Sequence, residues 1–318
     1  MDAVLGIDIA KAKFNVTLQQ PDGTRRRKAC LNTPEGFADL AAWLRRQHVD
    51  RVHACLEATG TYGDALATFL YDAGHQVSVV NPARVHHYAK SQLTRTKTDR
   101  VDADLIADFT ATQRPAPWAP LPLDARQLQA LLRRLEALVR MQTEETNRRQ
   151  AGELVPVVRD SIDTLLATLA EQIRIVRRLI RDHIDQHSHL REQRDLLTSI
   201  PGIGETTAAV LLGELFTKRY GSARQAAAFA GLVPRIAESG TLRGPTPLSK
   251  TGSGRLRKAL YFPAIAAIRF NPSIQALSAR MRVAGKPTMV VIGAAMRKLI
   301  HLAYGVLKSG RPYEAAHA

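Results

Sequence analysis

The chain has 318 residues, of which 45% are hydrophobic and 23% are charged. This length allows two domains with a sizeable core, and the composition excludes a wholly disordered protein. The formal net charge is +16, and residues 235–311 contain fourteen Lys and Arg against a single acid, Glu238. A basic stretch of this size is typical of nucleic-acid binders, with a solvated basic face as the alternative.

The first third of the chain alternates strand and helix patterns. Three strand patterns come first, VLGIDIA, FNVTLQQ and RRKACLN, with a hairpin signal at PDG. A helix with a Thr cap and a Pro start follows at TPEGFADLAAWLRRQ, and then VHACLEA and QVSVVNP are strands on either side of the helix TYGDALATFLYDAG. The helix TDRVDADLIADFTATQ closes this part. The order predicts an α/β domain with a mixed sheet and covering helices.

The two cysteines, Cys30 and Cys55, have no CxxC spacing, and we interpret them as core residues of a reduced, intracellular protein. No signal peptide is predicted, because Asp8 interrupts the hydrophobic run near the N-terminus. No uninterrupted apolar stretch approaches the roughly 18 residues of a membrane-spanning helix. We therefore expect a cytoplasmic protein without a membrane partner.

A proline-rich stretch, RPAPWAPLPL, predicts a domain boundary at about residues 114–122. Apolar residues three and four apart then predict long helices over 123–195, as an antiparallel helical hairpin or an intermolecular coiled coil. In this region we interpret His183, His187 and His189 as solvated rather than metal-binding. The predicted domains are 1–120, 121–195 and a mostly helical 196–318.

A short Pro-Gly-Ile-Gly turn at 201–204 separates two apolar helical segments. It resembles the helix-hairpin-helix motif of sequence-independent DNA binders, which holds phosphate on backbone N–H groups, although an ordinary tight turn is the alternative. The loops GTLRG and KTGSGR are predicted to be flexible and to follow a nucleic-acid backbone. The residues expected to bind nucleic acid are Gly202, Gly204, Arg243, Lys250, Arg255, Arg257 and Lys258.

Four carboxylates in the first 102 residues occur in unlike settings. Asp8 and Glu57 lie in apolar strand patterns, and Asp99 and Asp102 lie three apart in a helix. Ionised groups are costly to bury without a partner, and Asp and Glu oxygens are preferred ligands of Mg²⁺. Because i and i+3 share a helix face, Asp99 and Asp102 are expected to act together; Asp104 turns away, and Asp108 is the stronger competitor. In a basic protein this set predicts phosphodiester chemistry with a pair of Mg²⁺ ions.

The basic region supplies candidate nucleophiles, Ser239, Ser249 and Ser253, which neighbouring cations and a metal could activate. Spacing alone selects none of the three. The segment GPTPLSKT is superficially similar to a phosphate-binding P-loop, but Ser249 stands where the second Gly is required, and no strand pattern precedes it. We therefore reject a nucleotide site there.

Several motifs together resemble the IS110 family of insertion-sequence transposases, the DEDD transposases, which includes the Piv-type DNA invertases. They run in order from about residue 4 to 314: GIDIAKAKFNV, EATGTYG, KTDRVDADLIA, SIPGIG, FAGLVPRIAESG, SKTGSGRLRKALY and AYGVLKSGRPYE. The resemblance implies a RuvC-like domain of the RNase H type, with its metal-binding acids at Asp8, Glu57, Asp99 and Asp102. It also implies a nucleophilic serine at Ser239 in a C-terminal transposase domain.

By the same resemblance, Ser239 forms a covalent link to DNA, and an element-encoded bridge RNA pairs with donor and target DNA. The expected assembly is a homo-oligomer, a dimer or tetramer, in the bacterial cytoplasm at the nucleoid. Two alternatives remain: a RuvC-type, Mg²⁺-dependent junction nuclease that uses water, and an inactive nucleic-acid-binding protein. An ATPase related to sugar kinases and actin is disfavoured, because GID in the first strand has no second glycine-rich phosphate loop to accompany it.

Overall fold

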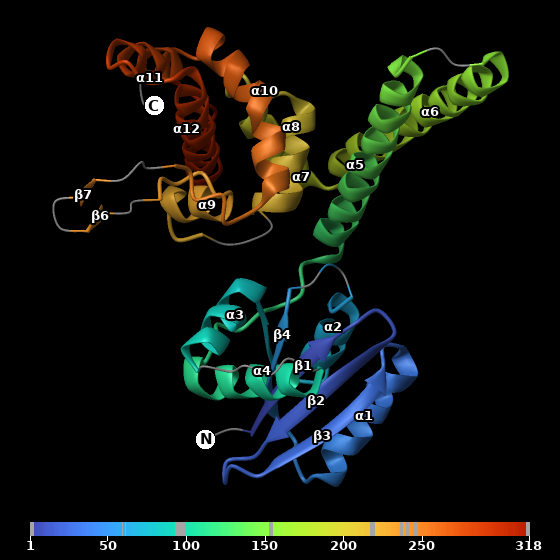
Figure 1. The fold of residues 1–318 in the computed structure, drawn as a ribbon. Helices are drawn as coiled ribbons and strands as arrows, with labels where there is room; N and C mark the ends of the chain where they lie inside the picture. The colour runs from blue at the N-terminus through green and yellow to red at the C-terminus, as the bar shows by residue number, and fades with distance from the viewer. Residues whose placement is uncertain are drawn as a thin grey trace. The chain divides into compact units, whose positions relative to one another are not determined.

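A computed structural model of the chain describes residues 3–58, 60, 62–92, 99–152, 155–216, 220–235, 238–239, 242–243 and 247–315, without the side chains of 99–101, 238–239 and 242–243. The chain forms two compact units, Met1–Pro120 and Leu121–Ala318. Figure 1 shows a sheet with helices in the first unit and mostly helices in the second. The two units are described separately below.

A five-stranded sheet in the order β3-β2-β1-β4-β5 is the framework of the N-terminal unit. Its strands are β1 (Ala3–Ile9), β2 (Lys13–Gln19), β3 (Arg25–Leu31), β4 (Val52–Glu57) and β5 (Gln76–Val80). β1, β2 and β3 pair antiparallel, whereas β4 is parallel to β1 and β5 is parallel to β4. The predicted mixed α/β sheet is confirmed.

Helices cover both faces of this sheet. α1 (Pro34–Arg46) and α2 (Asp64–Asp72) share one hydrophobic cluster with Leu5, Ile7 and Ile9 of β1. α3 (Pro82–Ser91) and α4 (Asp99–Gln113) share a second cluster, which contains Cys55 of β4. Since side chains alternate along a strand, the odd residues of β1 face α1 and α2, and the even residues face the other way.

Two helix starts illustrate how the local sequence directs the fold. As predicted, Thr33 caps α1, and its hydroxyl accepts a hydrogen bond from the Gly36 amide. α3 was not predicted, although Asn81 accepts from the Ala83 amide and Pro82 occupies the first turn. These are ordinary start signals. The helix escaped prediction because Val85 is its one buried residue, so it has almost no apolar periodicity.

Gly6 on β1 allows α4 to approach the sheet closely. A Cβ atom at this position would lie 2.3 Å from both the Ala103 carbonyl oxygen and the Ala107 amide nitrogen. The absence of a side chain at Gly6 therefore sets the distance between β1 and α4. It also identifies Ala103 and Ala107 as the part of α4 that faces the even residues of β1.

We expect Gly6→Ala to destabilise the N-terminal unit by about 1–3 kcal/mol, the usual cost of overpacking a core. Both tryptophans of the chain, Trp43 and Trp118, pack against the core of this unit, so tryptophan fluorescence in urea reports its unfolding selectively. The midpoint for Gly6→Ala should fall. An unchanged midpoint would mean that α4 can move away from β1 at no cost.

Helices dominate the C-terminal unit. They are α5 (Leu123–Gln150), α6 (Pro156–Gln186), α7 (Ser188–Thr198), α8 (Glu205–Val210), the π-helix η1 (Leu211–Phe216), α9 (Ala223–Phe229), α10 (Gly254–Phe270), α11 (Pro272–Val283) and α12 (Thr288–Ser309). α5 and α6 lie side by side, and their buried residues belong to the same hydrophobic core as those of α7 to α12. The helices predicted over 123–195 and the mostly helical character predicted for 196–318 are confirmed.

Two local predictions in this unit were wrong. His183 is buried rather than solvated, and its Nε2 donates to the Asp124 carbonyl at 2.8 Å, while His189 pairs with the Asp124 carboxylate. The segment GTLRG was expected to be a flexible loop, but β6 (Glu238–Ser239) pairs antiparallel with β7 (Leu242–Arg243). Both errors have the same cause. The burial of His183 and the pairing of β6 with β7 depend on tertiary contacts, and a short polar segment has no hydrophobic pattern that would reveal such contacts.

α12 is, among the described residues, a helix long and apolar enough to cross a membrane by length and composition alone. Within its apolar window, 56% is buried inside the protein. Its buried residues, among them Leu299, Ile300 and Ala303, belong to the core of the C-terminal unit. Core helices of this kind satisfy the same length and composition test, so the criterion is weak evidence for a membrane span.

Candidate active site

Asp8 and Glu57 are neighbours at one edge of the sheet. The parallel register of β1 and β4 pairs Gly6 with Cys55 and Ile7 with Leu56, so the next position places Asp8 beside Glu57. Each lies two residues beyond a position that faces α4, namely Gly6 and Cys55. Because strand side chains alternate, Asp8 and Glu57 belong to the α4 face at the carboxyl ends of their strands. Both side chains are partly exposed.

The direction of α4 follows from two contacts with the edge of the sheet. Asp104 binds Thr17 and Arg27, which stand in register with Gly6. Asp108 binds Arg25, which stands in register with Val4 through Gln19. α4 therefore runs antiparallel to β1: Asp104 lies level with Gly6, and the later residue Asp108 lies level with the earlier residue Val4. The N-terminal end of α4 extends toward the carboxyl end of β1, where Asp8 lies.

Helix and strand dimensions then give the level of Asp8 along α4. Asp8 is about 6.6 Å beyond Gly6 along the strand, at roughly 3.3 Å per residue. That distance corresponds to about four helical residues at 1.5 Å each. Counting back from the Ala103–Ala107 contact places Asp8 level with the stretch between Asp99 and Asp102. The fold thus brings all four positions to one end of the sheet.

Asp99 and Asp102 stand one turn before two residues of known environment. Asp99 precedes Ala103, which abuts Gly6, and Asp102 precedes Ile106, which is buried against Cys55 of β4. The Asp102 side chain is partly exposed, and the Asp99 side chain lies outside the description. The backbone thus places both helical positions at the same end of the sheet as Asp8 and Glu57, and the joint role of the four acids stays a prediction.

Two other acids of α4 have structural partners. Asp104 accepts hydrogen bonds from Arg27 at 2.8 and 2.9 Å and from the Thr17 hydroxyl at 2.7 Å, and Asp108 pairs with Arg25. Partial burial raises the pKa of Asp104, but the hydrogen bonds from Arg27 and Thr17 outweigh it and lower the pKa below its ordinary value. Asp108 was the stronger competitor as a ligand, and its position toward the opposite end of β1 argues against that role.

The lowered pKa of Asp104 predicts a pH-dependent contribution to stability. A carboxyl with a lowered folded pKa stabilises the fold fully above its unfolded pKa, near 3.8, and loses that effect as the pH falls through the folded value. The urea midpoint of the N-terminal unit should therefore drop as the pH falls below about 5 and on through the lowered pKa of Asp104, and it should drop less in Asp104→Asn. The control Asp50→Asn, at an exposed position, should keep the wild-type pH dependence. Identical profiles for wild type and Asp104→Asn would contradict the contribution.

The donor chemistry of this edge fits a hard divalent cation. Asp8, Glu57 and Asp102 offer carboxylate oxygens, which Mg²⁺ prefers, and Asn15 stands in register with Asp8 with an amide beside it. Within the described side chains, a set that leaves out Asp99, no group of three or more His, Cys, Asp or Glu is close enough to hold a metal. Asp8, Glu57 and Asp102 therefore do not form such a group in the structure, and the four-acid metal site stays a prediction.

Ser239, the predicted nucleophile, lies in the C-terminal unit on β6, where it pairs with Leu242 of β7. The segment that carries this hairpin is closed at its base by an antiparallel contact. The Arg235 amide donates to the Pro247 carbonyl at 2.7 Å, and the Ser249 amide donates to Val233 at 2.8 Å. The backbone of Ser239 is described and its side chain is not. Its role stays a prediction.

The glycine-rich motif after this segment fastens its base. Gly252 lies at φ 151°, and a Cβ there would be 2.2 Å from the Phe229 carbonyl. Arg257 donates to the Ala230 and Gly252 carbonyls at 3.0 and 3.2 Å, and the Ser253 hydroxyl caps α10 by accepting from the Leu256 amide. KTGSGR is therefore a structural clamp as well as a basic motif. Ser253 therefore has a structural function at the start of α10.

The other residues expected to bind nucleic acid lie in different environments. Arg255 is held by Glu136 and Glu214, which gives it a structural contact inside the unit. Gly202 has φ 104° and packs against α10, and Gly204 precedes α8. Lys250 and Lys258 are exposed, and the Arg243 side chain lies outside the description. The predicted phosphate contacts of this set stay predictions.

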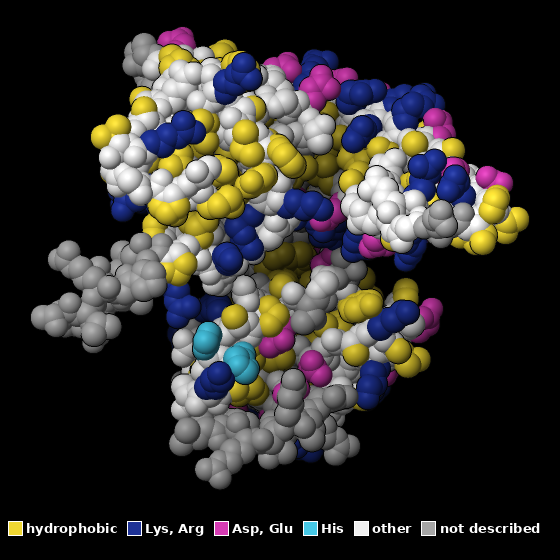
Figure 2. Space-filling view, turned by 45° about the horizontal axis from the view of Figure 1, so that its top comes forward, with side chains coloured by type: hydrophobic (Ala, Val, Ile, Leu, Met, Phe, Trp, Pro, Cys, Tyr) yellow, Lys and Arg dark blue, Asp and Glu magenta, His cyan; other side chains and the backbone are white. Residues whose placement is uncertain are grey.

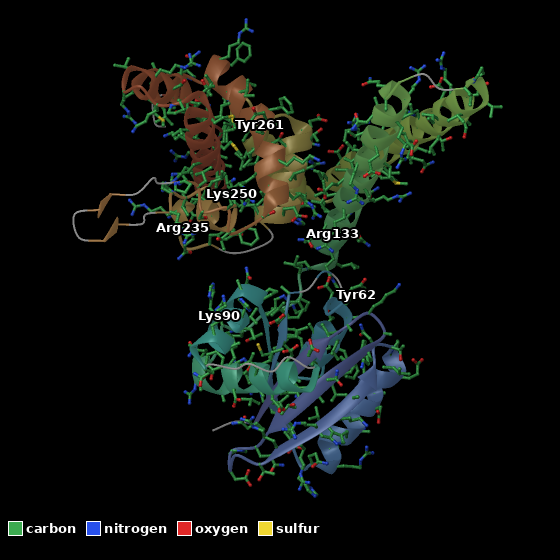
Figure 3. All side chains as sticks on the ribbon, viewed as in Figure 1. Tyr62, Lys90, Arg133, Arg235, Lys250 and Tyr261 are labelled. Atoms are coloured by element: carbon green, nitrogen blue, oxygen red, sulfur yellow. The ribbon has the colours of Figure 1, made fainter. Side chains whose placement is uncertain are left out.

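Sequence reasoning overlooked exposed residues that follow β4 and β5, two parallel strands whose carboxyl ends lie at the same edge of the sheet. α3 follows the end of β5 and contacts α4, and its residues His86, His87 and Lys90 are exposed. Figure 2 shows histidine and basic side chains on the N-terminal unit with acidic side chains nearby. Tyr62 is 49% exposed and follows β4, and Figure 3 labels it apart from Lys90 of α3. The run RVHHYAK, directly after a strand, was the available signal.

Comparison with protein families gives two matches in this chain. Residues 5–152 match a transposase family model for DEDD transposases of the IS110 type. Residues 194–279 match the model described as the transposase IS116/IS110/IS902 family. The first match contains all four acids, and the second contains Ser239. The two models together cover most of the chain.

Several curated relatives match most of the chain. The pilin gene-inverting protein of Moraxella bovis is 34% identical over 98% of this chain and 97% of its own length. The transposase for insertion sequence element IS1328 of Yersinia enterocolitica is 28% identical, with 81% of each chain covered. Among solved structures, T. thermophilus RuvC in complex with a Holliday junction substrate matches 37% of this chain and all of its own, at 16% identity and a TM-score of 0.29.

Proposed function

The chain belongs to the IS110 family of transposases and is a DNA-recombination enzyme, and from this we propose that it excises and inserts its own mobile element by Mg²⁺-dependent, RNA-guided recombination through a serine–DNA intermediate. The observation that carries the proposal is the convergence of Asp8, Glu57 and the start of α4 at one end of the sheet. Its further support is the match of a transposase model across Ser239.

The family implies dependence on a divalent metal, and Asp8, Glu57, Asp99 and Asp102 would hold it. When bound, Mg²⁺ would polarise the scissile phosphate and stabilise charge on its oxygens. The chain's own contribution is positioning: β1 and β4 fix two carboxylates side by side, and the Gly6 contact sets the distance to α4. Asp104 and Asp108 hold α4 to β2 and β3 through Thr17, Arg27 and Arg25.

We assign nucleophilic attack to Ser239. Its Oγ forms a bond to phosphorus, one P–O ester bond of the DNA breaks, and the leaving DNA oxygen takes up a proton while the serine loses one. A second attack by a DNA hydroxyl on the phosphoserine reverses these changes and joins the new strand ends. The energy of the phosphodiester is conserved in the intermediate, so no external energy source is needed.

The basic C-terminal unit supplies the nucleic-acid contacts in this proposal. Residues 235–311 carry most of the excess positive charge, and the phosphate backbone of DNA is the natural counterion. We further propose that an element-encoded bridge RNA pairs with donor and target DNA and that a dimer or tetramer is the active form. The reaction would take place in the bacterial cytoplasm, at the nucleoid.

A denaturing gel tests the proposed function. Labelled element-end DNA would be incubated with the protein, Mg²⁺ and RNA transcribed from the element, and samples would be run with and without protease. We expect a slow, protease-sensitive DNA adduct that requires Mg²⁺. Free cleaved DNA without an adduct would indicate a water-using junction nuclease instead. Bound but uncleaved DNA under all conditions would indicate an inactive binding protein.

A further inference from the structure

The outward side of α10 exposes large apolar side chains. Phe262 is 76% exposed, Phe270 61% and Ile265 41%. Single exposed apolar side chains are common on protein surfaces, but grouped ones mark interaction sites. The rings have defined neighbours: Tyr261 packs edge-on against Phe262 at 5.4 Å between ring centres. Figure 3 shows Tyr261 on this helix.

Basic residues flank these apolar side chains along the same side of the helix. Lys258, Phe262, Ile265 and Arg269 follow one another at spacings of four, three and four, which places them in one line; we call these four residues the α10 stripe. All four are exposed. The stripe is about 16 Å long at 1.5 Å per residue. At its end, the guanidinium carbon of Arg269 lies 5.3 Å from the ring centre of Phe270.

Charge decides which partner suits the stripe. Residues 254–311, which include α10, α11 and α12, contain no Asp or Glu. A symmetric contact with a second copy would bring the same basic surface against itself, which is unfavourable. A polyanion with exposed flat apolar groups fits better. In a duplex the bases are stacked inside, whereas a single strand presents both phosphates and base faces.

We propose that the α10 stripe binds a single-stranded segment of DNA, with a base stacked on Phe262 and phosphates at Lys258 and Arg269. In the proposed function an RNA pairs with donor and target DNA, and such pairing leaves the displaced DNA strand unpaired. The inference rests on DNA as the substrate of the proposed function, but it is independent of Ser239 and of the metal centre. It adds an aromatic surface to the basic contacts expected from the sequence.

Fluorescence anisotropy with the full chain and labelled oligonucleotides tests this assignment. The ligands are single-stranded DNA, duplex DNA and single-stranded RNA of the same sequence. Base–aromatic stacking of about 1–3 kcal/mol corresponds to about 5- to 150-fold in affinity, and we expect Phe262→Leu to lose at least the lower value for single-stranded DNA. Phe262→Trp should retain binding. Lys258→Gln should weaken the binding of single-stranded DNA. It should also reduce the slope of log affinity against log salt concentration by the amount of about one phosphate contact.

Matched controls separate this role from a structural one. Val157→Ala, at a residue 78% exposed on α6, should leave binding unchanged. Thermal unfolding should be the same for wild type, Phe262→Leu and Phe262→Trp. In Phe262→Leu the affinity for duplex DNA should change less than twofold. An equal loss of affinity for single-stranded RNA and single-stranded DNA is also consistent with the proposal, because bases of both can stack on the ring.

Three results would overturn it: unchanged single-stranded DNA binding in Phe262→Leu, equal loss for duplex and single strand, or loss for RNA alone. A fall in oligomer mass with unchanged binding would instead make the stripe an interface between copies. Adduct formation on the denaturing gel is measured separately. Failure of the stripe therefore cannot be confused with failure of the serine chemistry.

Discussion

Asp8→Asn should reduce recombination by about a thousandfold, because loss of metal-stabilised charge amounts to several kcal/mol and each 1.4 kcal/mol is a factor of ten. Asn keeps the size of the side chain but removes a negative ligand oxygen from the end of β1. Asp102→Asn should have a comparable effect, since the start of α4 lies level with Asp8. The measurement is the yield of recombinant DNA joints with Mg²⁺ and the element RNA.

Asp104→Asn is the control for this prediction. It removes the same charge from the same helix, two residues from Asp102, at a side chain bound to Arg27 and Thr17. We expect it to retain activity within about tenfold once its small loss of stability is allowed for. Equal losses of recombination activity in Asp102→Asn and Asp104→Asn would contradict the metal centre. They would show that any loss of negative charge or of stability in α4 lowers the activity.

Ser239→Ala should abolish the covalent DNA adduct, because no other atom can replace the Oγ that bonds to phosphorus. DNA binding should be preserved, since the backbone pairing of Ser239 with Leu242 does not depend on the hydroxyl. The expected result is a loss of adduct beyond detection on the denaturing gel, with unchanged affinity for duplex DNA.

Ser249→Ala is the matched control for the nucleophile. Ser249 lies at the base of the same segment, where its main chain donates to Val233 and accepts from Thr251. Its adduct yield should equal that of wild type. Ser253→Ala is a poorer control, since losing the α10 cap costs about 1 kcal/mol of stability. Cleavage that persists in Ser239→Ala would favour a water nucleophile.

The sequence predicted the N-terminal fold well because its patterns are strong. β4 is an apolar run that ends in Glu57, and β1 is an apolar run with Asp8 as its next-to-last residue. In both sequences the apolar run marks the buried strand and the acid marks the place where it ends. The turn per helical residue separated Asp104 from Asp102 in the prediction. Asp104 is bound to Thr17 and Arg27 on β2 and β3, and the metal role of Asp102 stays a prediction. Helical geometry alone supplied that distinction.

Other features required the tertiary structure. Arg255 lies in a basic motif, and its partner Glu136 is 119 residues away in the chain, so local sequence gives no sign that its charge is neutralised. Arg257 was grouped with it for the same reason, but it donates to backbone carbonyls. The role of Gly6 depends on α4, about a hundred residues later. Contacts between residues so far apart in the chain cannot be recognised from a local sequence pattern.

The most direct measurement is mass spectrometry of the trapped adduct after trypsin and nuclease digestion. The three candidate serines fall in different tryptic peptides: 236–243 for Ser239, 244–250 for Ser249 and 251–255 for Ser253. We predict a nucleotide on peptide 236–243, with fragmentation placing it on Ser239 rather than on Thr241, and only when Mg²⁺ and intact Asp8 are present. A nucleotide on either of the other peptides, or none on a protein that cleaves DNA, would contradict the account.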